Sequence, residues 1–216
     1  MNKYILFLLI PLASACLTTA TTRVSVLTIS ECELPCWNDI TPGVTPPEEA
    51  KQILENTEGI GAANVESFYQ LVEIHFSLFL EMPGLNPKIR GDIFSDGTKV
   101  TELWLVGNLN VTFDDIIQRI GEPEFVISMP FIGGGNTFVS VYPSKGVSFR
   151  ISPELKIIAA DTEISTLTLF APTDYDRHLE GGTFTLGKLD ASGTQKIMYP
   201  WEGYGNIEEL YPPRLP

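Results

Sequence analysis

The sequence is poor in the residues from which catalytic and metal sites are most often built. Its 216 residues include only two histidines and three cysteines. A serine hydrolase needs a base beside its nucleophile, and no Gly-x-Ser-x-Gly motif is present to hold such a serine. His75 lies on the polar side of a strand pattern, and His178 lies in a polar loop sequence. The sequence therefore predicts a protein without a catalytic site, a bound metal or a cofactor.

Basic residues are also scarce. The chain contains 14 Lys and Arg against 27 Asp and Glu, which gives a formal net charge of −13. Nucleic acids and anionic lipid head groups are bound through basic surfaces, so the composition argues against both as partners. An acidic surface serves solubility, and a cationic partner is the alternative explanation.

No apolar stretch is long enough to span a bilayer. A membrane helix needs about 20 apolar residues, whereas the N-terminal run Tyr4–Leu12 is far shorter and no later stretch qualifies. This run follows the basic Lys3 and precedes Ala-Ser-Ala at 13–15, so residues 1–15 have the three parts of an export signal. We therefore expect an exported protein whose mature chain begins at Cys16.

Two fates of Cys16 are open. The small residues before it satisfy ordinary signal peptidase, which would release a soluble secreted chain. The segment from Leu12 to Cys16 also resembles the lipobox of bacterial lipoproteins, whose cysteine receives a diacylglycerol before cleavage. Cys32 and Cys36 can pair with each other, which would leave Cys16 as an odd thiol unless it is lipidated. Cysteine usage thus favours a lipid anchor at Cys16, followed by a Thr-rich tether over residues 16–31.

Cys32 and Cys36 lie four positions apart with Pro35 between them. Proline favours a turn, so in an exported chain the pair is expected to close a small loop with a disulfide. A zinc site would need a second Cys or His pair, which the sequence lacks. Free thiols and redox chemistry are the alternatives, although redox motifs separate their cysteines by two residues rather than three.

An internal repeat is the most informative pattern. Residues Val44–Ile53 align without gaps on Val111–Ile120, 67 positions later. Each copy begins with a threonine suited to cap a helix, Thr45 or Thr112, and continues with acidic residues in the first turn. A narrow apolar stripe follows, and a glycine ends each helix, Gly121 in the second copy. The repeat predicts two short amphipathic helices.

Strand-like sequence follows each predicted helix. After the first helix come Val65–Glu81, Lys88–Phe94 and Lys99–Val106, the last two joined by a hairpin turn at 95–98. The strands expected after the second helix are Phe125–Ser128, Thr137–Tyr142, Gly146–Ile151, Ile157–Ala160 and Ile164–Phe170.

This order predicts an α+β protein made of two tandem units, each a helix followed by an antiparallel sheet. The first unit spans residues 32–107 and the second 108–172. Residues 173–216 are rich in aromatic residues, glycine and proline, and we expect them to form a C-terminal extension that packs on the body. Each helix should cover one face of its sheet.

The two helix motifs resemble a known bacterial module. The stretch from Thr41 reads Thr-Pro-Gly-Val-Thr-x-x-Glu-Glu-Ala, and that from Thr112 reads Thr-Phe-Asp-Asp-Ile-Ile-x-x-Ile-Gly-Glu-Pro. This pattern is similar to the signature of a module found in outer-membrane-assembly small lipoproteins and, as a tandem pair, in the secreted beta-lactamase inhibitor protein. The sequence Cys-Glu-Leu-Pro-Cys-Trp from Cys32 likewise resembles the start of bacterial envelope lipoproteins. The resemblance implies a beta-lactamase-inhibitor-protein-like fold and binding rather than catalysis.

Three function classes follow. The tether, the repeat and the lack of catalytic residues favour a lipid-anchored cell-envelope protein that is a non-catalytic protein-binding or assembly module. A small-molecule or glycan-binding protein is the alternative, and a hydrolase is the third. Trp104 and Tyr142 are the candidate binding surface, on the sheet face left open by the helices, because aromatic residues are favoured hot-spot anchors. If residues 201–211 or the facing unit cover that surface, both are core residues instead.

Overall fold

The computed structural model describes residues 25–27, 32–60, 64–68, 71–79, 88–130, 135–180 and 197–214. The predicted signal segment, Cys16 and most of the predicted tether lie outside the described residues. The described part is a mixed α+β structure with few helices, built mostly of antiparallel sheet. The predicted fold class is therefore confirmed at this level.

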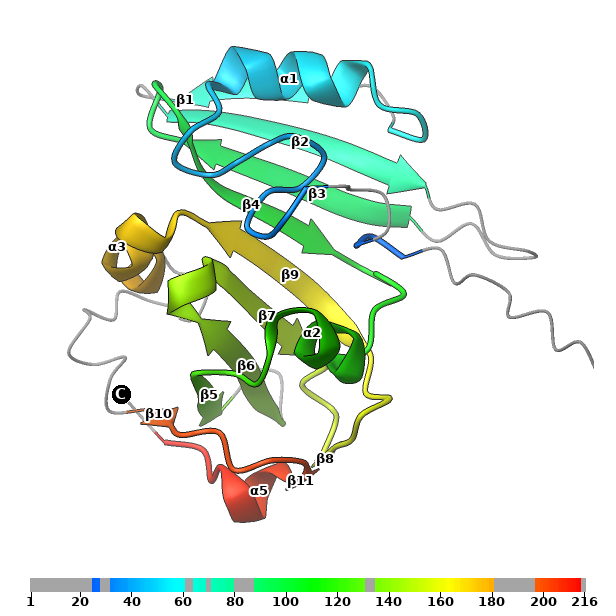
Figure 1. Cartoon of the computed structure of the whole chain (residues 1–216), viewed down its shortest axis with the longest axis vertical. Coiled ribbons are helices and arrows are strands. Elements are labelled where there is room, and N and C mark those ends of the chain that lie inside the picture. The colour runs from blue at the N-terminus through cyan, green and yellow to red at the C-terminus, as the bar shows by residue number, and fades with distance from the viewer. Residues whose placement is uncertain are drawn as a thin grey trace, which may run out of the picture.

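Nine strands form one continuous sheet in the order β1-β2-β3-β4-β9-β7-β6-β5-β10, with antiparallel neighbours throughout (Figure 1). The first half consists of β1 (Asn64–Phe68), β2 (Leu71–Phe79), β3 (Lys88–Ser95) and β4 (Val100–Val106). The second half consists of β9 (Ile164–Phe170), β7 (Val147–Ile151), β6 (Asn136–Tyr142), β5 (Phe125–Pro130) and β10 (Met198–Tyr199). The halves meet where β4 pairs with β9, so the two predicted sheets are one sheet.

Two strand predictions differ from the structure. The stretch predicted as strand over Val65–Glu81 is a hairpin of β1 and β2, and Glu81 lies outside the described residues. The strand predicted over Ile157–Ala160 is reduced to β8 (Ile157–Ile158), which pairs with β11 (Gly205–Asn206) rather than with the main sheet. The side chain of Ile157 is exposed, whereas Ile158 is buried in the large core, so β8 packs on the body without pairing with the main sheet.

In the described ranges, four helices and two short 3-10 segments accompany the sheet. Figure 1 shows α1 (Pro47–Glu55) above the first half and α2 (Phe113–Ile120) in front of the second. Their buried side chains belong to the same hydrophobic cluster, so both helices cover the same side of the sheet. The remaining elements are the 3-10 segments Pro143–Lys145 and Pro172–Asp174, and the helices α3 (Tyr175–Glu180) and α5 (Ile207–Leu210).

The two repeat helices begin differently. Thr112 forms a capping box on α2: its hydroxyl accepts from the Asp115 N–H at 3.2 Å, and the Asp115 carboxylate accepts from the Thr112 N–H at 2.7 Å. The helix ends at Gly121, at a positive φ of 91° that favours glycine. Thr45 does not cap α1, which starts after Pro46 without a side-chain cap. The Thr45 hydroxyl instead accepts from the Thr41 N–H at 2.8 Å.

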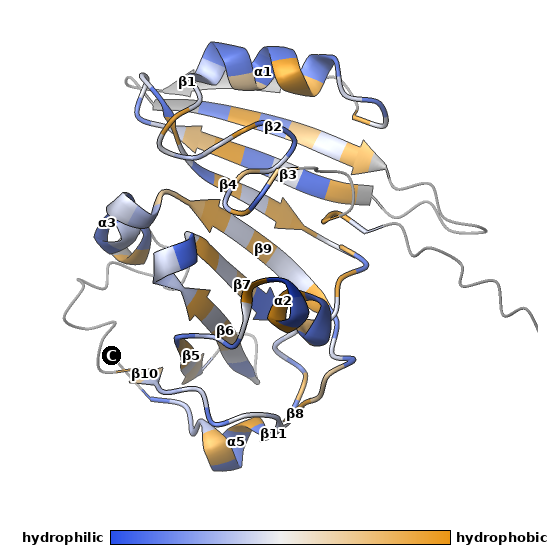
Figure 2. Ribbon diagram, viewed as in Figure 1, coloured by the Kyte–Doolittle hydropathy of each residue, from blue (hydrophilic) through white to orange (hydrophobic). Residues whose placement is uncertain are grey.

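Strand alternation produces two cores. The side facing α1 and α2 carries the large core, which includes Leu103 and Leu105 of β4 and Phe149 of β7. Figure 2 shows the resulting alternation of apolar and polar bands along the strands. A smaller core on the other side of the second half lies beneath α3, and its buried members are Ile127, Met129, Val139, Val141, Leu179 and Ile197.

The segment around the disulfide packs on the large core. Cys32 and Cys36 are bonded, with an S–S distance of 2.11 Å, as the spacing predicted. Trp37, next in sequence, is buried and stacks on Phe76 with ring centroids 5.7 Å apart. Gly91 opposite Phe76 is needed here, because a Cβ atom at this position would lie inside the Phe76 ring.

Part of the predicted tether belongs to the body. Ser25, Val26 and Leu27 are buried, and the Trp37 indole N–H donates to the Val26 carbonyl at 3.1 Å. The Arg119 guanidinium at the end of α2 donates to the Leu27 carbonyl at 3.0 Å. Residues 25–27 therefore pack on the body, because Val26 and Leu27 bury apolar surface that a solvated tether would expose.

Candidate functional site

The sheet face opposite α1 carries a set of polar and aromatic side chains in its first half. Ile74, Phe76 and Leu78 of β2 point into the large core, and the residues between them point to the other face, as the alternation predicted. Pairing across β2, β3 and β4 arranges that face in rows. One row is Glu73, Phe94, Glu102, and the next is His75, Asp92, Trp104.

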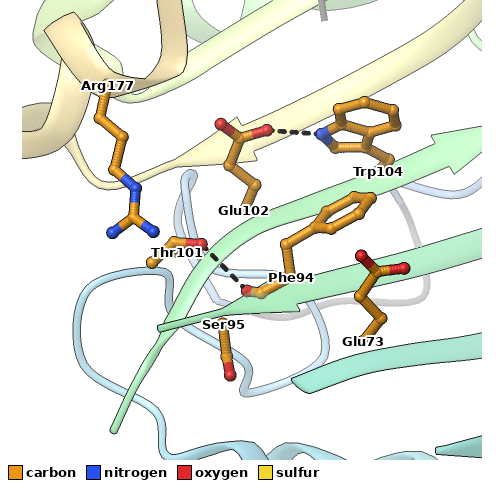
Figure 3. Close-up of a pocket in the computed structure, with 7 residues that line it drawn as sticks. All are labelled: Glu73, Phe94, Ser95, Thr101, Glu102, Trp104 and Arg177. Carbon is orange, nitrogen blue, oxygen red and sulfur yellow. Dashed lines mark hydrogen bonds between the residues drawn. The ribbon is translucent and has the colours of Figure 1, made fainter. Parts of the chain in front are cut away.

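A hollow of about 270 Å³ lies on this face (Figure 3). Phe94 and Trp104 form its aromatic part, with ring centroids 4.7 Å apart and planes tilted by 56°. The Trp104 indole N–H donates to the Glu102 carboxylate at 2.7 Å, which holds the indole in place. The lining residues come from β2, β3, β4 and α3 and are Glu73, Phe94, Ser95, Thr101, Glu102, Trp104 and Arg177.

The charged side chains at the hollow differ in exposure. Glu73 is 41% exposed and lies 3.7 Å from His75 Nε2. Arg177 of α3 is 52% exposed, and its guanidinium is 3.9 Å from the Asp96 carboxylate. These long, solvated contacts constrain their side chains only weakly, since exposed ion pairs are worth at most about 1 kcal/mol. The side chains of Glu73 and Arg177 can therefore adapt to a ligand, whereas the Trp104 indole is held in place by Glu102.

Asp92 forms the polar floor beside the hollow. Its carboxylate is buried and contacts His75 Nδ1 at 2.7 Å and Arg90 Nε at 2.9 Å. Buried carboxylates require such partners because desolvation otherwise penalises their charge. Asp92 therefore orders His75 and Arg90 at the surface, and both side chains extend the polar face beyond Trp104.

His178 occupies a second polar cluster behind the hollow. It lies on α3 and is 1% exposed, so its placement in a polar loop was wrong. The ring stacks on Phe170, with Nε2 3.3 Å from Ser148 Oγ and Nδ1 3.2 Å from Glu102 Oε1. A neutral imidazole satisfies both partners when Nδ1 donates to Glu102 and Nε2 accepts from Ser148.

This serine, histidine and carboxylate have the nitrogen assignment of a nucleophilic triad. Ser148 is nevertheless 1% exposed and sits within β7, paired opposite Thr168 of β9. A nucleophile must reach the substrate, whereas the Ser148 side chain is almost completely buried. The cluster is therefore best explained as the polar anchor of α3. Sequence reasoning missed it, because a serine in a strand pattern carries no signal of its distant partners.

The structure separates the two residues predicted to form the binding surface. Trp104 lines the hollow, half-buried on the open face. Tyr142 is 1% exposed on the opposite face, where its hydroxyl donates to the Gly121 carbonyl at 3.0 Å beside Phe149. Burial raises the pKa of Tyr142 well above that of a solvated tyrosine. The assignment of Tyr142 to an open surface was wrong, because Gly121, which follows α2, and the C-terminal segment, through Tyr211 on Phe138, lie against that side of β6.

Two further observations concern metals and membranes. Among the described residues, one cluster has its side-chain ligand atoms close together, namely Cys32, Cys36 and Asp39. The two sulfurs are bonded to each other and cannot act as thiolate ligands, so this cluster is not a metal site. Within the described ranges, no helix has the length and apolar character needed to cross a membrane.

No protein-family model, curated protein or solved structure matches this chain. The resemblance of its helix motifs to an envelope module consequently stays a prediction. The open face around Trp104 is the basis for the function proposed below.

Proposed function

We propose that the chain is a lipid-anchored protein of the bacterial cell envelope that acts as a non-catalytic protein-binding or assembly module. The observation that carries the proposal is the partly exposed pair of Phe94 and Trp104, set in a hollow on the open face of the first half-sheet. Tryptophan is enriched among the residues that dominate interface energetics. Trp104 is therefore a candidate anchor residue for an interface on the open face.

The size of the hollow favours a partner protein over a small ligand. Pockets that enclose drug-sized molecules usually measure about 300–1,000 Å³ and bury most of the ligand. The hollow at Trp104 measures about 270 Å³, which is below that range. It accommodates one protruding side chain of a partner that also contacts the surrounding surface of β2, β3 and β4.

The order of elements supports descent from a repeated module. In each half a helix precedes antiparallel strands: α1 precedes β1 to β4, and α2 precedes β5, β6, β7 and β9. The halves also mirror each other about the β4–β9 junction. We include in the proposal that the chain has a tandem arrangement like that of the beta-lactamase inhibitor protein.

Anchoring is the second part of the proposal and rests on the sequence of residues 1–16. Full-length protein should partition into the detergent phase when expressed with its signal segment. Replacement Cys16→Ser should abolish this partition or block processing. Recovery of unmodified wild-type protein in the aqueous phase would contradict lipidation.

Capture from envelope extract tests the binding surface. The processed full-length protein, solubilised in detergent, should retain one stoichiometric protein partner, and Trp104→Ala should reduce capture at least tenfold. The control is Tyr204→Ala, which truncates an exposed aromatic residue on the C-terminal segment. Thermal melts of both variants verify folding. Undiminished capture by a folded Trp104→Ala protein would place the interface elsewhere.

A small-molecule or glycan-binding protein is the second candidate, and the flanking of the aromatic pair by Glu73, Glu102 and Arg177 favours it. Aromatic rings and adjacent hydrogen-bonding groups also suit a sugar ring. Native mass spectrometry of protein purified from its own host separates the candidates. A retained ligand of a few hundred daltons, lost in Trp104→Ala, would favour this second function.

A further inference from the structure

The charges around the Trp104 hollow are unequal. The two carboxylates of Glu73 and Glu102 line it, against one guanidinium, that of Arg177. Arg177 has the Asp96 carboxylate at 3.9 Å, and Arg90 has the Asp92 carboxylate at 2.9 Å. The two arginines on this part of the face thus each have an aspartate beside them, in addition to the two lining glutamates. Carboxylates therefore outnumber guanidinium groups at this hollow by two to one.

The position of the glutamates relative to the rings is also specific. Phe94 on β3 pairs directly with Glu73 on β2 and with Glu102 on β4, so a carboxylate stands on each side of this ring. Figure 3 shows Glu102 and Glu73 on opposite sides of Phe94, with Trp104 adjacent. A cation over an aromatic ring is attracted by the ring's negative face, most strongly for tryptophan, and nearby carboxylates reinforce that attraction.

From this arrangement we infer that the hollow receives a cationic side chain, an arginine or lysine, presented by the partner protein. The inference rests on the proposed protein-binding function and specifies the chemistry of the partner. Glu73, 41% exposed, can turn toward an incoming charge without loss of a buried contact. The volume of about 270 Å³ suits the end of one long side chain.

The net charge of the whole chain also favours a cationic partner. A net charge of −13 attracts a basic partner over distances comparable to the Debye length and accelerates encounter. Association should consequently weaken as salt concentration rises. An apolar side chain in the hollow would not produce this dependence, so salt sensitivity separates the two kinds of occupant.

The test uses the indole N–H signal of Trp104 in the processed full-length protein, ¹⁵N-labelled and held in detergent micelles. The probes are acetyl-Gly-Arg-Gly-Arg-Gly-amide and the same peptide with citrulline in place of arginine. Citrulline keeps the length and planar end group of arginine, but it lacks the charge and has a carbonyl oxygen in place of one donating nitrogen. The arginine peptide should shift the Trp104 signal saturably, and the citrulline peptide should leave it unmoved. Trp104→Phe identifies the signal.

Two glutamate variants test whether the carboxylate at the hollow attracts the arginine peptide. Glu73→Gln should weaken binding of the arginine peptide about two- to fivefold, the range expected for one exposed ion pair. Glu48→Gln removes an exposed glutamate from α1 on the far side of the sheet and should change binding little. Raising sodium chloride from about 50 to 500 mM should weaken peptide binding further.

An equal response to both peptides, no response to the arginine peptide, or no effect of Glu73→Gln would overturn the cationic assignment. The protein-binding proposal is judged separately by partner capture. If Trp104→Ala abolishes capture while the arginine peptide leaves the Trp104 signal unmoved, the interface stands and the occupant is not cationic. If capture survives Trp104→Ala, the proposed interface itself is wrong.

Discussion

The two halves of the sheet have the same order of elements but are covered differently. The second half has α2 and the segment from Trp201 to Tyr211 on one face, and α3 over a separate core on the other. The first half has α1 and the disulfide loop on one face. Its other face carries Glu73, His75 and Trp104, which are all partly exposed. One half is thus buried on both sides, and the other is open on one.

This difference assigns different roles to the two halves, support to the second and binding to the first. Burial on both faces makes the second half the stable support, since each buried aromatic side chain contributes several kcal/mol. The open face of the first half can change its side chains without loss of a core. Binding residues on a rigid support lose little conformational entropy when a partner docks. The comparison therefore predicts that matched substitutions in the two halves have unequal effects.

The largest contrast is expected between two phenylalanines. Phe113 is buried beneath Trp201 and against Phe149, with ring centroids 5.1 and 4.8 Å away. Phe113→Ala should destabilise the protein by about 3–5 kcal/mol because it leaves a cavity. Phe94→Ala on the open face should cost about 1 kcal/mol. Urea unfolding measures both, and equal losses would contradict the division between the halves.

The two histidines provide a second, smaller contrast. His178→Ala removes the imidazole that stacks on Phe170 and the two ring nitrogens that contact Ser148 and Glu102. The free energy of unfolding should therefore fall by about 2–3 kcal/mol. His75→Ala should cost about 1 kcal/mol, because Arg90 still pairs with Asp92. Thermal unfolding at neutral pH compares them. A milder effect of His178→Ala than of His75→Ala would refute the anchoring of α3.

The smallest effect concerns the turn between β3 and β4. Hydrogen bonds from the Thr98 hydroxyl, followed by the Thr98 and Lys99 N–H groups, lower the pKa of Asp96 to about 2. A lowered folded-state pKa adds stability above the unfolded value of about 3.9, and this stability is lost as pH falls toward 2. The melting temperature of the wild type should therefore fall between pH 4 and 2.

Thr98→Val provides the control for the turn, since it removes the strongest donor to Asp96 while keeping a β-branched residue. The variant should be slightly less stable than the wild type at pH 5, and the two should converge at pH 2. A difference that is the same at both pH values would show that the hydrogen bond does not depend on the charge of Asp96.

Some features were predictable because they depend on neighbours in the sequence. The capping box at Thr112, the end of α2 at Gly121 and the disulfide of Cys32 and Cys36 all involve residues a few positions apart. The polar and apolar sides of β2 were predictable because strand geometry has a period of two. The helix cap predicted at Thr45 is absent, because the Thr45 hydroxyl accepts a hydrogen bond from the Thr41 N–H instead.

The sequence by itself determined the composition of each strand face, the disulfide and the start of the second helix. The tertiary structure decided what covers each face: it buried Tyr142 against Gly121 and Phe149, buried His178 against Phe170 and left Trp104 in a hollow. The physical reason is that alternation specifies which side chains share a face, whereas exposure depends on elements that pack there from distant parts of the chain. The Glu102–His178 contact joins residues 76 positions apart, and no local pattern encodes such a meeting.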